Sequence, residues 1–236
     1  MSRLLTTVSA ITVIAGTYVD ADVPKVIADI APIHSLVSRV MDGVGEPKLI
    51  VPNETSPHDY RLRPADAQAI EDANLVFWMG EGLTPWMERA LEALNRDTDI
   101  VEFLALEEST RLSFREGALF EAHDDHDDHD DHDDHDKEHD DHDDHDDHDK
   151  EHDDHAGHDH GEFDPHAWLS TSNAKIWLNV IAAKLSSIDP NNAGIYFANA
   201  SEARNEIDAL DDEINVMLAP VRGGKFIVFH DAYQYF

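Results

Sequence analysis

The chain has 236 residues, enough for one large or two smaller domains, and a formal net charge of −34. More than half of this negative charge lies in residues 123–160, where 21 acidic residues stand against two lysines. The rest of the chain is also acidic and has no basic stripe. Nucleic-acid binding is therefore excluded, because a protein that neutralises phosphates needs clustered Lys and Arg.

Residues 1–21 have the pattern of an export signal peptide. Arg3 supplies the positive start, Leu4 to Gly16 form a mostly apolar stretch, and Val19-Asp20-Ala21 offers small residues for cleavage. A short membrane anchor is the less favoured alternative, because the stretch is shorter than the roughly 20 residues of a membrane span. The chain has no cysteine, so it lacks a lipobox thiol and disulfides. We expect a periplasmic protein that begins near Asp22.

Residues 22–121 alternate short apolar runs with helical patterns, and we interpret them as an N-terminal α/β lobe. The expected strands are 26–30, 48–51, 75–79 and 99–103, and the expected helices are 33–40, 65–73 and 84–94. Strands that alternate with helices predict parallel βαβ units. In such sheets, ligands bind in the loops beyond the carboxyl ends of the strands.

Residues 122–162 interrupt this order with histidines spaced mostly three apart and separated by Asp-Asp pairs. Low hydrophobicity and high charge predict disorder without metal. Imidazole suits zinc, copper and nickel, so we predict a secondary, low-affinity metal loop that collects zinc, senses it or stores it. A functionally neutral solvated loop is the alternative. The histidines are His123, His126, His129, His132, His135, His139, His142, His145, His148, His152, His155, His158 and His160.

Beyond this tract, residues 163–189 are expected to complete the N-terminal lobe with a helix capped by Ser172. Residues 190–219 predict one long linking helix, which Pro220 and the following glycines end. Residues 225–229 predict a buried strand, and a lone strand cannot form a sheet. Either this strand joins the first sheet or 220–236 begins a C-terminal lobe that lies mostly outside the sequence. We favour the second interpretation.

Four histidines lie outside the tract, and three of them occupy comparable loop positions. His58 and His166 each follow a proline that restricts the backbone, and His230 follows the last predicted strand. Asp164 and Asp231 lie within two residues of His166 and His230, as possible acceptors for the second ring nitrogen. His34, at a helix start, is interpreted as a packing or surface residue.

The three motifs resemble those of the periplasmic zinc-uptake solute-binding proteins of ABC transporters. They are Ser56-Pro57-His58-Asp59-Tyr60, Asp164-Pro165-His166-Ala167-Trp168-Leu169 and Phe229-His230-Asp231-Ala232-Tyr233. The resemblance covers the mature chain and implies two α/β lobes, joined by one long helix, with the metal between them. It implies that His58 and His166 of the first lobe and His230 of the second hold Zn²⁺. It further implies a monomer that delivers Zn²⁺ to a membrane permease with a cytoplasmic ATPase.

Three alternatives remain open at this stage. Manganese and iron members of the family generally carry an acidic residue in place of the third histidine, so His230 favours zinc. A zinc hydrolase is disfavoured, because the sequence has no HExxH and no clearly placed general base. We therefore expect a binding protein and no enzyme. The fourth ligand could be a carboxylate from a further lobe, water or a tract histidine.

Overall fold

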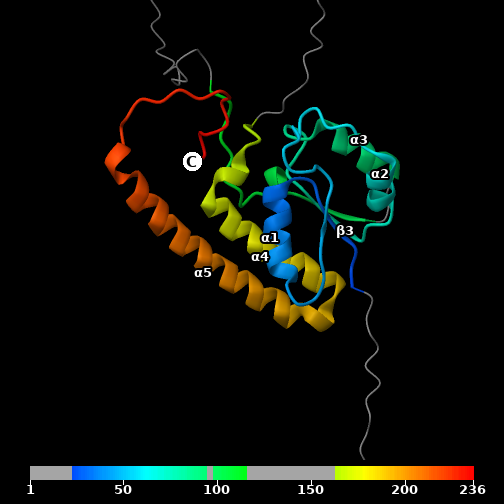
Figure 1. Ribbon diagram of the computed structural model, residues 1–236. Helices are drawn as coiled ribbons and strands as arrows, with labels where there is room; N and C mark the ends of the chain where they lie inside the picture. Colours follow the sequence, from blue (N-terminus) through cyan, green and yellow to red (C-terminus); the bar gives the residue numbers. More distant parts are fainter. Residues whose placement is uncertain (1–22, 95–97, 116–162) are drawn as a thin grey trace, which may run out of the picture.

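The computed structural model of the chain describes residues 23–94, 98–115 and 163–236 (Figure 1). The predicted signal peptide and all thirteen tract histidines lie outside these residues. Within the described part, no helix combines the length and the apolar character that crossing a bilayer demands.

Four parallel strands form one sheet, as the alternating pattern predicts. They are β1 Val26–Ala28, β2 Lys48–Leu49, β3 Leu75–Trp78 and β4 Asp99–Glu102, in the order β2-β1-β3-β4. The connecting helices are α1 Ala31–Met41, α2 Pro64–Glu71 and α3 Pro85–Leu94. The strands are one to two residues shorter than predicted, and the parallel α/β lobe is confirmed.

Each face of the sheet buries its own apolar cluster, because successive strand residues point to opposite sides. Val26 and Phe77 pack with residues of α1, α4 and α5, whereas Ile27 and Val76 pack with residues of α2 and α3. Figure 1 shows the same arrangement, with α1 and α4 on one side of the sheet and α2 and α3 on the other. The carboxyl ends of the strands are left open to carry loops.

Asp29 follows β1 and is completely buried at this open edge. Its carboxylate accepts hydrogen bonds from the backbone N–H groups of Ile30 and Met79, at 2.8 and 2.9 Å, and lies 3.4 Å from the Thr84 hydroxyl. Burial raises the pKa of Asp29 to about 7, although these hydrogen bonds oppose the shift. Asp29 thus joins the ends of β1 and β3 to the start of α3.

Helix α4 spans Thr171–Ile188 and completes the first cluster with Trp177 and Leu185. The prediction that Ser172 caps this helix is wrong: Ser170 is the N-cap, and its hydroxyl accepts the Asn173 N–H at 3.2 Å. The helix starts earlier because the 3₁₀ turn Ala167–Leu169 (η2) ends at Ser170, whose extended backbone suits an N-cap.

The predicted long helix is present as α5, Ala193–Leu218, between the 3₁₀ turns Pro190–Asn192 and Ala219–Val221. Its first half packs on α4 and α1 through Tyr196, Ala200 and Ala203. The apolar pattern continues beyond that contact, where Met217 is 65% exposed. Lys175 of α4 forms ion pairs with two aspartates of α5 and ties the two helices together.

The prediction of a buried strand at 225–229 is wrong. These residues form no regular element, and Ile227 and Phe229 are fully exposed. An apolar run becomes a strand only where a neighbouring strand satisfies its backbone, and the described sheet ends at β2 and β4. The alternative that this segment joins the first sheet is therefore also wrong. That 220–236 begins a further lobe stays a prediction.

Candidate metal centre

His58 lies in the long loop between β2 and α2, at the open edge of the sheet. Two contacts fix the backbone of this loop. The indole N–H of Trp86 donates to the Pro57 carbonyl at 2.9 Å, and the hydroxyl of buried Tyr60 donates to Asp66 at 2.6 Å. Helices α2 and α3 therefore hold the residues on both sides of His58.

His166 is the most deeply buried of the three histidines, at 7% exposure. Its ring Nδ1 lies 2.7 Å from Asp164 Oδ1, and its backbone N–H donates to the same oxygen at 2.9 Å. Burial acts to raise the pKa of Asp164, but hydrogen bonds from His166 and Gln234 outweigh it and lower the pKa below its ordinary value. An ionised Asp164 accepts the Nδ1–H and leaves the Nε2 lone pair available to a metal.

His230 is exposed and belongs to the segment after α5. Its neighbour Asp231 does not act as the predicted acceptor, because its carboxylate pairs with the guanidinium of Arg115. This pair links the residue next to His230 to Arg115, which precedes the tract by several residues in the sequence. The sequence places Arg115 and Asp231 far apart, so only the fold reveals the contact.

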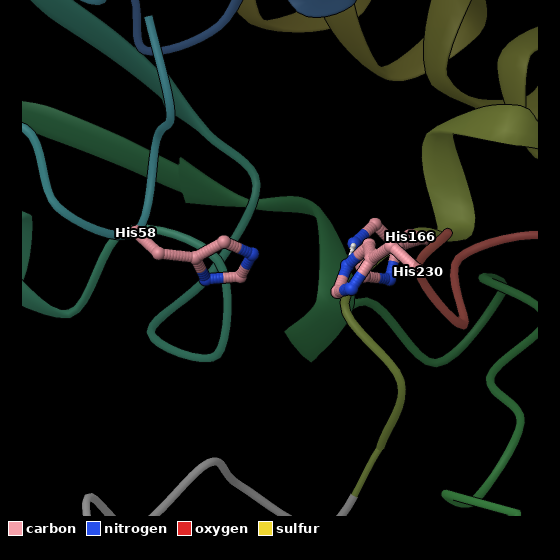
Figure 2. Close-up of side chains that lie close together, drawn as sticks. All are labelled: His58, His166 and His230. Atoms are coloured by element: carbon pink, nitrogen blue, oxygen red, sulfur yellow. Dashed lines mark hydrogen bonds between the residues drawn. The ribbon is translucent and has the colours of Figure 1, made fainter.

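The three rings converge from three separate loops (Figure 2). One ligand nitrogen from each of them falls within a group whose members lie no more than 4.8 Å apart. His166 Nε2 and His230 Nε2 are 3.1 Å apart, close to the roughly 3.3 Å between two nitrogens that share a tetrahedral Zn²⁺ with Zn–N bonds of 2.0–2.1 Å. A movement of His58 of at most about 1.5 Å would bring its nitrogen to the same spacing.

The contact between His166 and His230 has a chemical consequence. When Asp164 accepts the Nδ1–H of His166, the Nε2 of that ring is an acceptor and His230 donates its Nε2–H to it. A metal ion between the rings would take the place of that proton. That proton would then lie on Nδ1 of His230, so binding requires a change of tautomer in His230, whereas His166 keeps its proton on Nδ1.

A cavity of about 590 Å³ lies beside the three histidines. Apolar side chains dominate its lining, among them Ile30, Leu83 and Trp168. In the metal-free protein, three neutral imidazoles beside this apolar lining avoid the cost of burying a net charge.

The structure brings together the three histidines that the motifs single out and places the fourth elsewhere. His34 Nε2 lies 3.0 Å from the Pro47 carbonyl, which is the packing role expected of it. The sequence indicated Asp164 as an acceptor but gave no sign of Trp86 or Gln234, whose contacts join residues at least 29 positions apart.

Comparison with known proteins matches residues 26–236 to the family described as zinc-uptake complex component A, periplasmic. The chain is 48% identical over 216 residues to the high-affinity zinc uptake system protein ZnuA of Paracoccus denitrificans, and 49% identical over 211 residues to that of Brucella abortus. These alignments cover 92% and 89% of this chain. The chain spans 64% and 63% of those relatives' lengths.

The fold also resembles a solved structure of a ZnuA deletion mutant with zinc bound. The two share 24% identity and a TM-score of 0.66, over 91% of this chain and 65% of that one. At this identity the likeness concerns the fold alone.

Proposed function

Because this chain belongs to the periplasmic zinc-uptake complex component A family, we propose that it is the zinc-binding component of an ABC transporter. It captures Zn²⁺ in the periplasm and delivers it to a membrane permease driven by a cytoplasmic ATPase. It works as a monomer and catalyses no reaction. The relatives' names support zinc as the cargo and uptake as the purpose.

The convergence of His58, His166 and His230 carries this proposal. Three neutral imidazoles suit a borderline-soft ion such as Zn²⁺ better than Mn²⁺, which prefers oxygen ligands. A water molecule or a further protein group would complete four-coordination. Since ligand imidazoles must be neutral, falling pH should weaken binding.

The tract between His123 and His160 fits the same function as a low-affinity collector. The described residues that precede and follow the tract are paired, because Ser113 and Phe163 form a β-bridge and Asp164 N–H donates to the Leu112 carbonyl at 2.8 Å. Asp164 in turn contacts His166. The described chain therefore stops and resumes close to the proposed site, which supports a tract that supplies ions to this site.

The test is a zinc titration against chelators of graded strength. Changing His58, His166 and His230 together to Ala should abolish the tight site, whereas deleting residues 123–160 should leave it and remove only weaker binding. His34→Ala is the matched control, since it removes a part-buried histidine that contacts Pro47. Tight binding that survives in the triple variant would disprove the proposal. Competition between Mn²⁺ and Zn²⁺ in the same assay distinguishes a manganese-uptake protein.

A further inference from the structure

Gln234, two residues from the end of the described chain, touches the group that orients His166. Its side-chain N–H₂ donates to Asp164 Oδ2 at 2.7 Å and to the Ser113 carbonyl at 3.0 Å. The other carboxylate oxygen, Oδ1, accepts both the backbone and the ring N–H of His166. The carboxylate is therefore held at both oxygens, by Gln234 on one side and by His166 on the other.

The neighbouring residue anchors the backbone of this segment independently. Tyr235 Oη donates to the Asp164 carbonyl at 2.9 Å and accepts the Leu112 N–H at 2.8 Å. Its ring also packs against the first apolar cluster. Since Tyr235 and the Arg115–Asp231 pair hold the segment in place, the amide of Gln234 is not needed to dock it.

We propose that Gln234 is a positioning residue for the metal: it fixes Asp164 so that His166 keeps its Nε2 directed at the ion. This inference rests on the proposed zinc site and assigns a further residue to it. Gln234 lies four residues after His230, and Asp164 lies two before His166. The contact between them thus couples the loop that carries one ligand to the orientation of another.

Removing the Gln234 amide should leave Asp164 held by His166 alone, at Oδ1, so that both side chains are less well ordered. Groups that orient a ligand from outside the coordination shell typically contribute 10–100-fold to metal affinity, and we expect about 10-fold for Gln234→Leu. Leucine keeps the size of the side chain but loses both donated hydrogen bonds. The variant should keep the thermal stability of the metal-free protein, because Tyr235 still anchors the segment.

The test is a double-mutant cycle in the full chain, with the zinc dissociation constant measured by chelator competition. The single variants are Gln234→Leu and Asp164→Asn, and the double variant combines them. If Gln234 acts through Asp164, its 10-fold effect should largely vanish in the Asp164→Asn background. Gln68→Leu is the matched control: Gln68 is the only other glutamine, and its amide faces Glu71 and Asp72 on the surface of α2.

Two results would overturn the inference: an unchanged zinc affinity in Gln234→Leu, or a loss that is the same with and without the Asp164 carboxylate. The second would mean that Gln234 only fastens the segment. Failure of the zinc site itself has a different signature, because the triple histidine variant would then bind zinc as tightly as the natural chain.

Discussion

The α/β body and the segment after α5 contribute to the same site in opposite ways. His58 and His166 lie in loops whose neighbouring residues are buried or hydrogen-bonded to the body, as with Tyr60 and Asp164. His230 is exposed and follows Phe229, which is fully exposed. Two of the proposed ligands are thus held by a packed core, and the third by a few polar contacts. A metal ion bound by all three histidines would hold the segment to the body more strongly than the contacts between the two regions do without it.

The two regions are also stabilised by different kinds of interaction. Apolar burial stabilises the body, since a buried large side chain contributes roughly 1.5–3 kcal/mol by leaving water. In the segment, Ala232 is buried, and Tyr235 packs against the core with part of its surface. Its other contacts include the Arg115 ion pair and the hydrogen bonds of His230, Gln234 and Tyr235. Local opening should therefore begin in this segment.

The largest contrast is expected between Trp177→Ala and Phe229→Ala. Trp177 is completely buried, packs against the Phe103 ring and donates its indole N–H to the Ser109 hydroxyl at 2.8 Å. Its truncation should therefore cost about 3–5 kcal/mol of unfolding free energy. Phe229→Ala should change it by no more than about 0.5 kcal/mol. Urea unfolding of the metal-free protein measures both. A large cost for Phe229→Ala would show that the segment is part of the folded core.

A second contrast is expected in the response to zinc. If a structural zinc site contributes about 10–16 kcal/mol over four ligands, losing His230 should cost roughly 3 kcal/mol, or more than 100-fold in affinity. Zinc should slow hydrogen exchange of the amides in residues 225–236 in the natural chain and not in His230→Ala. Amides of β1 and β3 serve as the internal control. If zinc protected the segment equally in both proteins, His230 would not be a ligand of the metal.

The sequence predicted the body well because its signals are local. Apolar runs such as Leu75–Trp78 and the long helical pattern before Pro220 depend on neighbouring residues alone. The same kind of signal failed at 225–229, because a strand also needs a partner and none of the described strands lies beside that run. The three histidines were found from motifs, and their convergence was not deducible from spacing.

Most of the contacts that orient the site could not be predicted from the sequence. Asp164 could be proposed because it lies two residues from His166, but Gln234 and Arg115 reach the site only through the folded chain. Capping was predicted to within two residues: both Ser170 and Ser172 are able to cap a helix, and the 3₁₀ turn before Ser170 decides between them.

A third prediction concerns pH and the body alone. Burial raises the pKa of Asp29 from 3.8 to about 7, so the folded state holds this proton more tightly than the unfolded state. The resulting stabilisation is complete below about pH 4 and is lost as the pH rises to 7, by at most about 1.4 kcal/mol per pH unit. Asp29→Asn should flatten this decline, measured by urea unfolding, while the exposed Asp212→Asn should not. An unchanged slope in Asp29→Asn would mean that another group titrates.

The smallest expected effect lies where the body meets the site, at the start of α4. The Ser170 hydroxyl accepts the Asn173 N–H, and Asn173 is itself buried and bonded to the Thr110 and Ala167 carbonyls. Ser170→Ala should therefore cost about 1 kcal/mol of unfolding free energy. Ser172→Ala, two residues on and exposed, should cost a few tenths of that value or less.

The turn η2 connects His166 to Ser170, but the loss of a cap only frays the helix end and leaves His166 held by Asp164. Zinc affinity should therefore stay within about two-fold in both variants. A larger cost for Ser172→Ala would show that Ser172 and not Ser170 caps the helix. A loss of zinc affinity in Ser170→Ala that matches Gln234→Leu would show that the helix start and not the carboxylate sets the position of His166.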